Sequence, residues 1–355
     1  MNEHLKELID KLNAEKTLSR SEWVELIDGH GDEERAYAAS IANSLRKKRF
    51  GNKIFIRGIV EFSNYCKNDC YYCGIRRSNK NAQRYRLTEE EILECCDEGY
   101  ETGYRTFVLQ SGEDGAYPPA RMAEIVRSIK SAHPDCAVTL SIGEQEREEY
   151  ALLREAGADR YLLRHETASK ELYEKLHPSF LSFEHRMKCL RDLKELGFQT
   201  GAGMMIGAPY QRTEHLAEDM LFLAEFQPQM VGMGPFLPHK DTDFRDKPKG
   251  SYELTLFLLA LTRIMLPNVL LPATTALGTI RPDGREQGVL HGANVIMPNL
   301  SPTAVRKKYM LYDNKICTED TTADCKFCLQ ARMKSIGCEV AVTRGDFGEF
   351  VDSGS

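Results

Sequence analysis

Short apolar runs alternate with helical patterns along most of this chain, and the alternation limits the folds open to it. Eight runs have the length and composition of buried β-strands, at residues 54–60, 105–110, 136–142, 159–164, 199–205, 230–234, 269–274 and 293–298. Helices are expected between them, among others at 88–102, 182–196, 213–226 and 253–266. Eight strands, each followed by a helix over about 250 residues, predict an α/β fold of the closed (β/α)8 TIM-barrel type. A partial barrel with fewer strands is the alternative.

Two extensions flank the predicted barrel. The first fifty residues read as helical, with a capping box at Ser19 and Glu22 and an apolar stripe in "DEERAYAASIANSLRKK". We therefore expect an N-terminal helical extension at 1–50, the barrel at 51–310 and a C-terminal extension at 311–355.

Charge and hydropathy exclude several classes of protein. A net charge of -6 is too small to indicate a nucleic-acid or membrane-surface partner. No apolar run reaches the length of a membrane span, and the polar start "MNEHLKELIDKLNAEK" is not a signal peptide. We expect a cytoplasmic protein, in which the 11 cysteines stay reduced and build no disulfide framework.

Three cysteines lie close together directly after the first predicted strand, in "YCKNDCYYCG". Cys66, Cys70 and Cys73 have a C-x3-C-x2-C spacing, which suits metal ligation better than a disulfide. Zinc would need a fourth ligand, and the next histidine after the motif along the chain is His133. An iron–sulfur cluster fits three soft thiolates better, because a four-iron cluster then keeps one iron free for a non-protein ligand. Zinc and a purely structural cluster remain the alternatives.

This spacing, with Tyr72 before the third cysteine, resembles the motif of the radical S-adenosylmethionine (SAM) enzymes. Longer segments resemble the HydE-type maturases of [FeFe]-hydrogenase, and they are "EFSNYCKNDCYYCGIRR", "VLQSGED", "DRYLLRHET", "TGAGMMIG", "VGMGPFLPH", "PATTALGT" and "GANVIMPN". The resemblance covers about residues 35 to 330. It implies that the three cysteines hold a [4Fe–4S] cluster whose free iron binds SAM.

The resemblance also implies a SAM site made of Tyr72, Ser111, Gly112, Glu113, Ser141, Glu166 and Arg186. In it, Glu166 would bind the ribose hydroxyls and Arg186 would pair with the SAM carboxylate. The residues alone indicate less. Arg186 lies in a helical run, where a charged side chain usually faces solvent, and Glu166 would equally serve as a cap for the next helix.

Two arginines lie within otherwise apolar predicted strands, where an unpaired charge is costly. We predict that Arg57 and Arg160 make the barrel interior a basic pocket for an anionic, carboxylate-bearing iron complex. Neutral residues expected in the same pocket are Thr139, Thr274, Thr275 and Tyr309, the last of them on a late predicted helix. The alternative is that each arginine pairs with a buried glutamate or points outward between helices.

A second cysteine group lies in "CTEDTTADCKFC", beyond the eighth predicted strand. Cys317, Cys325 and Cys328 suit zinc or an iron–sulfur cluster, and the resemblance implies an accessory [2Fe–2S] cluster at the surface. A structural role is the alternative to a redox role.

A basic run of Arg76, Arg77, Lys80, Arg84 and Arg86 follows the first cysteine group. It is expected to be a solvated loop, with docking of an acidic partner or guidance of an anionic substrate as the alternative.

The resemblance implies reductive cleavage of SAM to a 5'-deoxyadenosyl radical in the assembly of the di-iron subcluster of [FeFe]-hydrogenase. The implied substrate is a small cysteine-ligated iron complex with CO and cyanide, supplied by a partner maturase. The implied electron donor is a ferredoxin or flavodoxin, the contacts with the maturases are transient, and the protein is expected to be a monomer.

Three alternatives remain. Methylornithine synthase and biotin synthase share the barrel and the first motif. Biotin synthase carries further cysteines on its strands, whereas here the later strands offer only Cys136, at the wrong end. A non-catalytic iron–sulfur scaffold would keep both clusters but would need no SAM pocket.

Overall fold

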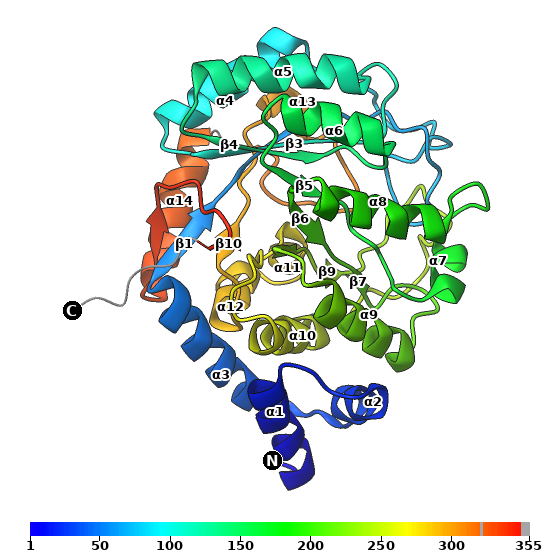
Figure 1. Ribbon diagram of the computed structural model, residues 1–355, viewed down its shortest axis with the longest axis vertical. Coiled ribbons are helices and arrows are strands. Elements are labelled where there is room, and N and C mark those ends of the chain that lie inside the picture. Colours follow the sequence, from blue (N-terminus) through cyan, green and yellow to red (C-terminus); the bar gives the residue numbers. More distant parts are fainter. Residues whose placement is uncertain (320–321, 349–355) are drawn as a thin grey trace.

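The computed structural model describes residues 1–319 and 322–348, with the backbone alone for residues 322–326. Parallel strands form a central barrel that helices surround (Figure 1). The strands are β1 (Lys53–Ile56), β2 (Gly58–Ser63), β3 (Thr106–Ser111), β4 (Ala137–Ser141), β5 (Arg160–Leu162), β6 (Gln199–Ala202), β7 (Met205–Ile206), β8 (Met230–Val231), β9 (Gly234–Pro235), β10 (Val295–Ile296) and β11 (Glu339–Ala341).

The barrel is closed. Six strands form one parallel sheet in the order β2-β3-β4-β5-β6-β8. Isolated parallel bridges complete the ring, and they join Met230 to Leu270, Pro272 to Val295, and Asn299 to Ile59. The segment around residues 270–272 and the segment from β10 to residue 299 therefore fill the seventh and eighth positions, and the closed (β/α)8 prediction is confirmed.

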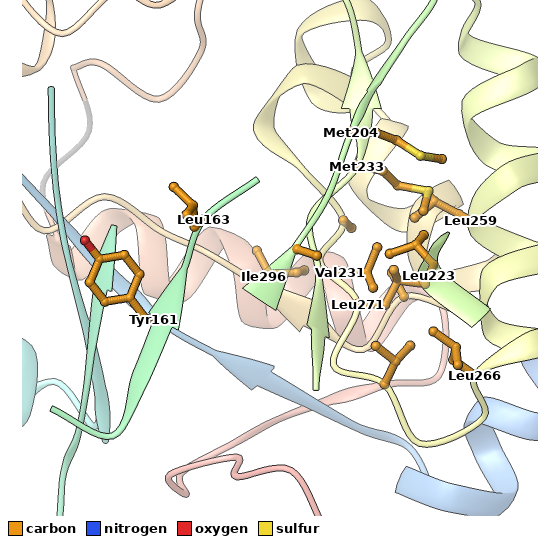
Figure 2. Close-up of a cluster of buried hydrophobic side chains, with 14 of the residues drawn as sticks. Tyr161, Leu163, Met204, Leu223, Val231, Met233, Leu259, Leu266, Leu271 and Ile296 are labelled. Atoms are coloured by element: carbon orange, nitrogen blue, oxygen red, sulfur yellow. The ribbon is translucent and has the colours of Figure 1, made fainter. Parts of the chain in front are cut away.

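The outer layer consists of helices, given with their bounds as α4 (Glu89–Glu101), α5 (Pro119–Ala132), α6 (Arg147–Glu155), α7 (Lys170–Leu176), α8 (Phe183–Glu195), α9 (Thr213–Phe226), α10 (Tyr252–Met265), α11 (Thr275–Ile280), α12 (Gly284–Leu290), α13 (Thr303–Arg306) and α14 (Thr322–Ser335). The four helices predicted by range match α4, α8, α9 and α10 to within one residue at each end. Figure 2 shows how strand and helix meet in the core, where Val231 and Leu271 lie near Leu223 of α9 and Leu259 of α10.

The first fifty residues form the predicted helices, α1 (Glu3–Glu15), α2 (Arg20–Gly29) and α3 (Asp32–Phe50). Ser19 and Glu22 make the expected capping box at the start of α2. The three helices pack on the outside of the barrel, α1 and α3 against α10 and α2 against α9 (Figure 1). None of the described helices is long and apolar enough to cross a membrane.

The C-terminal extension contributes to the barrel itself. Strand β11 pairs in parallel with β1, and residues 342–348 cover the N-terminal end of the barrel. There the guanidinium of Arg160 donates to the carboxylate of Asp346 at 2.6 Å and to the carbonyl of Arg344 at 2.7 Å. Any ligand must therefore enter from the opposite, C-terminal end of the strands.

Candidate functional site

The loop after β2 carries Cys66, Cys70 and Cys73, and all three line one cavity of about 410 Å³ at the C-terminal end of the barrel. The N–H of Cys73 donates to the carbonyl of Cys70 at 3.3 Å. The loop approaches the next strand so closely that a Cβ atom at Gly112 would lie 2.3 Å from the carbonyl oxygen of Tyr65. Glycine is therefore the residue type that fits at this contact.

The electrostatics of the three thiols suit a metal cluster. Burial raises the pKa of Cys73 to about 12 and raises the pKa values of Cys66 and Cys70, with the neighbouring thiolates adding to the effect at Cys70. A bound metal displaces such protons and supplies the missing positive charge. Among the side chains of residues 1–319 and 327–348, no three Cys, His, Asp or Glu residues converge on one ion. This argues against mononuclear zinc and fits a cluster, whose thiolates bind different irons.

Tyr72 lines the same cavity, and its hydroxyl is held by a histidine that the sequence did not single out. The Nε2 atom of His177 lies 3.1 Å from this hydroxyl, and its Nδ1 atom lies 2.8 Å from the carbonyl of Tyr173. Because a carbonyl only accepts, Nδ1 carries the proton and Nε2 accepts from Tyr72. Burial lowers the pKa of His177 to about 3, so the imidazole stays neutral.

The free energy of unfolding of the metal-free protein should lose about 2 kcal/mol between pH 7.5 and 5 because of His177. The folded protein leaves this residue unprotonated over that range, since its pKa is about 3, whereas the unfolded chain takes up a proton near pH 6.5. The contribution is therefore complete above pH 6.5 and is lost on acidification. Urea unfolding of His177→Phe should show a pH dependence that is smaller by this amount, and substitution of the exposed His4 should leave it unchanged. An unchanged slope in His177→Phe would contradict the assignment.

Ser111, Gly112 and Glu113 end and follow β3, and they line the cavity together with Ser141 at the end of β4. The carboxylate of Glu113 accepts a hydrogen bond from the backbone N–H of Glu144 at 3.0 Å. The same carboxylate lies 3.1 Å from the ammonium group of Lys67 on the cysteine loop. The backbone N–H of Lys67 also donates to the carbonyl of Glu113 at 2.9 Å. This segment therefore connects the cysteine loop to the loop after β4.

Arg186 and Glu166 also line the cavity. The guanidinium of Arg186 is buried, forms an ion pair with Glu144 and donates to the carbonyl of Arg164 at 2.7 Å, so the alternative of a solvated helix face is wrong. The carboxylate of Glu166 lies 3.0 Å from the Arg164 guanidinium. Glu166 has a left-handed backbone, with φ of 66°, and the residue before α7 is Ser169, so Glu166 does not cap that helix.

Thr274, Thr275 and Tyr309 line the same cavity. The prediction of a helix at Tyr309 is wrong, because α13 ends at residue 306. Tyr309 belongs instead to a strap, residues 307–317, that forms one wall of the cavity. The ammonium of Lys315 pairs with Glu61 inside the barrel and donates to the Tyr309 carbonyl at 3.0 Å, which draws the strap inward instead of continuing the helix.

The other three predicted substrate residues, Arg57, Thr139 and Arg160, do not line this cavity. Side chains alternate between the inside and the outside of a barrel strand. The three residues stand two positions before residues that do line the cavity, namely Ile59, Ser141 and Leu162. They form the next inward-facing layer, toward the N-terminal end of the barrel.

The two arginines of this layer differ in their partners, and neither pairs with a buried glutamate. Arg160 is fixed by the aspartate of the C-terminal extension. The guanidinium of Arg57 is 5% exposed, its Nη1 atom contacts the sulfur of Met230 at 2.9 Å, and in the described chain its other nitrogens have no hydrogen-bond partner. Burial, reinforced by the charge of Arg160, holds the pKa of Arg57 well below its ordinary value. The hydroxyl of Thr139 is likewise buried without a partner among the described residues.

Only part of the second cysteine group is described. Cys317 is half-buried, with its sulfur 3.4 Å from a guanidinium nitrogen of Arg285, and Cys328 is exposed on α14. The side chain of Cys325 lies outside the described residues. The accessory site therefore stays a prediction.

The basic run after the first cysteine group is only in part the solvated loop expected from the sequence, because Arg77, Lys80 and Arg86 are exposed whereas Arg76 and Arg84 are not. Arg76 is buried and forms ion pairs with two aspartates. Arg84 donates to four backbone carbonyls. Arg86 forms a bidentate ion pair with Asp114, at 2.7 and 2.9 Å.

Three residues of the site were not predicted from the sequence, namely His177, Glu144 and Arg164. Glu144 and Arg164 stand in segments that follow strands, "SIGE" and "RHET", where polar residues of a barrel gather at the C-terminal end. His177 follows a helix and carries no comparable signal in the sequence.

Comparison with known proteins agrees with this site. The family model described as Radical SAM superfamily matches residues 60–223. The chain is 50% identical over 297 residues to the [FeFe] hydrogenase maturase subunit HydE of Thermotoga maritima, covering 84% of each chain. It is 30% identical over 326 residues to the 3-methylornithine synthase of Methanosarcina acetivorans, covering 91% of each.

Solved structures give the same fold. The crystal structure of methylornithine synthase has a TM-score of 0.81 at 28% identity and covers 94% of this chain and 97% of that chain. The structure of HydG, a maturase of the [FeFe]-hydrogenase, has a TM-score of 0.81 at 20% identity and covers 98% of this chain and 78% of that chain.

A closed barrel whose cysteine loop enters the cavity at the C-terminal ends of the strands, together with these matches, defines a radical SAM enzyme. Enzymes of this class use a [4Fe–4S] cluster and SAM, and the buried thiols fit the cluster. Within the superfamily, the chain belongs to the family of the [FeFe]-hydrogenase maturase subunit HydE.

Proposed function

We propose that this protein cleaves SAM reductively and acts in the assembly of the di-iron subcluster of [FeFe]-hydrogenase. The observation that carries the proposal is the meeting of the three thiols with Tyr72, Ser111, Gly112, Glu113, Ser141, Glu166 and Arg186 in one cavity. The [4Fe–4S] cluster, when held by Cys66, Cys70 and Cys73, supplies the electron that splits SAM into methionine and a 5'-deoxyadenosyl radical.

The protein's own residues bind and orient SAM. The segment Ser111–Glu113 would hold the amino group, Arg186 would hold the carboxylate, and Glu166 would accept from the ribose hydroxyls. Glu144 already neutralises Arg186 in part, so the guanidinium can take a second anion without leaving its place. The strap with Tyr309 walls the cavity and keeps water from a carbon radical that reacts with almost anything.

The substrate of this proposal is a cysteine-ligated iron complex with CO and cyanide, bound through an anionic group. The layer beneath the cavity supports this substrate, since among the described residues no partner takes up two nitrogens of the Arg57 guanidinium or the Thr139 hydroxyl. An anion would supply the charge that the buried guanidinium lacks, and the planar fork suits a carboxylate. Thr274 and Thr275 would add neutral hydrogen bonds from the cavity wall.

Two further features belong to the proposal. Cys317, Cys325 and Cys328 would hold an accessory [2Fe–2S] cluster near the surface, and iron, sulfide and zinc analysis of the isolated protein checks this. The partners would be the other hydrogenase maturases, in transient contact, and a ferredoxin or flavodoxin as electron donor.

The decisive experiment uses the anaerobically reconstituted protein with SAM, reductant and the candidate iron complex. We expect 5'-deoxyadenosine formation that the complex accelerates, and activation of a hydrogenase lacking its di-iron subcluster. Formation of 3-methylornithine without hydrogenase activation would assign the protein to the other enzyme class. Failure to bind SAM would favour an iron–sulfur scaffold.

A further inference from the structure

The exposed side chain of Tyr210 is connected to the cysteine loop through two successive contacts between aromatic rings. Tyr71, between the second and third cysteines, contacts the ring of Phe244 edge-on, with the ring centres 6.2 Å apart. Phe244 in turn contacts Tyr210 edge-on at 6.1 Å, and Tyr210 is 52% exposed. Two lysines flank this exposed ring, Lys247 at 5.0 Å and Lys175 at 6.0 Å from its centre.

The loops around Tyr210 all belong to the C-terminal end of the barrel and contact one another. Arg76, beside the cysteine loop, pairs with the loop that carries Phe244, and Asn81 donates to Asp241 of the same loop at 2.8 Å. The N–H of Tyr71 donates to the last carbonyl of α7 at 3.1 Å. We call the surface formed by loops 76–81, 175–181, 208–212 and 240–249 the aromatic face.

The aromatic face carries unbalanced positive charge. In the part of the chain that the structure describes, its exposed cations without a carboxylate at ion-pair distance are Arg77, Lys80, Lys240, Lys247 and Lys249. Of the carboxylates here, Asp243 pairs with Arg76 and Asp246 with Arg245. Asp241 keeps its charge, because its hydrogen-bond partner Asn81 is neutral, and it offsets one of the five cations. The face is therefore cationic, although the whole chain has a net charge of -6.

We propose that the aromatic face is the docking surface for an acidic one-electron carrier protein that reduces the cluster. This rests on the proposed function, which needs one electron for each SAM cleaved. The carrier is oxidised by one electron and the cluster is reduced by one, and no bond or proton changes place. Electron transfer falls steeply with distance, so a carrier must dock where little protein separates it from the thiols. Complementary charge gives such an encounter its rate and orientation.

The test compares two double variants with the same change of charge. Lys247→Glu/Lys249→Glu alters the aromatic face, and Lys47→Glu/Lys48→Glu alters exposed positions at the end of α3, beside the start of β1 at the opposite end of the barrel. Titration of an acidic flavodoxin into the metal-free proteins gives the affinity without any turnover. We expect the aromatic-face variant to bind at least tenfold more weakly at low salt, and the α3 variant to bind like the parent.

Turnover supplies the second readout. Deoxyadenosine formation at limiting flavodoxin should fall in the aromatic-face variant by a similar factor, and formation with dithionite should not change. Tyr210→Ser, which leaves the charges in place, should also weaken flavodoxin-driven turnover alone. Equal binding by the two double variants, or an equal loss with dithionite, would overturn the docking surface. A parent protein that cleaves no SAM even with dithionite would instead refute the proposed function.

Discussion

Cys70→Ala should reduce the reductive cleavage of SAM to below detection. The residue is one of three thiols that share a half-buried loop, and within the described chain no further Cys or His joins them to replace a lost ligand. With two thiolates the cluster should not survive reconstitution. The measurement is 5'-deoxyadenosine by chromatography, with iron and sulfide content determined on the same sample.

Cys189→Ala is the matched control for this variant. Cys189 is also buried, but it lies on α8 with its sulfur 3.5 Å from a histidine nitrogen, and it does not line the cavity. The control should keep its iron and its cleavage activity. Full cleavage by Cys70→Ala protein would refute the assignment of the thiols to the cluster.

Arg57→Met should lower substrate-dependent turnover roughly 10- to 150-fold. This factor corresponds to a lost interaction free energy of about 1.5–3 kcal/mol, the size of a hydrogen bond to a charged group. The same change should leave SAM affinity intact, because Arg57 lies one layer below the cavity that holds the SAM residues. It should not lower the free energy of unfolding, since none of the described carboxylates pairs with the buried guanidinium and a methionine of similar shape is cheaper to bury. Arg160 is less informative, because its removal also frees the aspartate that closes the barrel.

Arg263→Met provides the contrast. Its guanidinium is equally buried, but it donates to the carbonyl of Gly292 at 2.8 Å, to that of Pro267 at 2.9 Å and to the side chain of Asn294 at 2.9 Å. This variant should lose several kcal/mol of stability, because three acceptors, two of them buried, lose a donor. Hydrogenase activation, SAM affinity and urea unfolding should be compared for both variants. An Arg57→Met protein that is destabilised like Arg263→Met, with unchanged activation, would return Arg57 to a purely structural role.

The barrel and its helices were predictable because their signals are local. A buried strand or an amphipathic helix can be recognised from the pattern of about ten to fifteen residues. The two residues of a capping box, such as Thr88 and Glu91, are three positions apart. The cysteine loop was predictable for the same reason. The residues proposed to bind SAM are spread over several strands, and they were predicted through the resemblance and the rule that strand ends meet on one rim.

The partners of these residues were not predictable, because they come from distant parts of the chain. His177 meets Tyr72 across 105 positions, Glu144 meets Arg186 across 42, and Lys315 meets Glu61 across 254. The last contact also explains the error at Tyr309, where a long-range ion pair overrides the local helical pattern.

The sequence alone determined the order of the strands and helices and the place of the three clustered cysteines, since each depends on short-range periodicity or spacing. Only the tertiary structure decided which buried charges are neutralised. Arg57 and Arg160 look alike in the sequence, but Asp346 reaches one and in the described chain no carboxylate reaches the other. The cost of a buried charge depends on what the fold brings within a few ångströms of it, and no local pattern of residues contains that information.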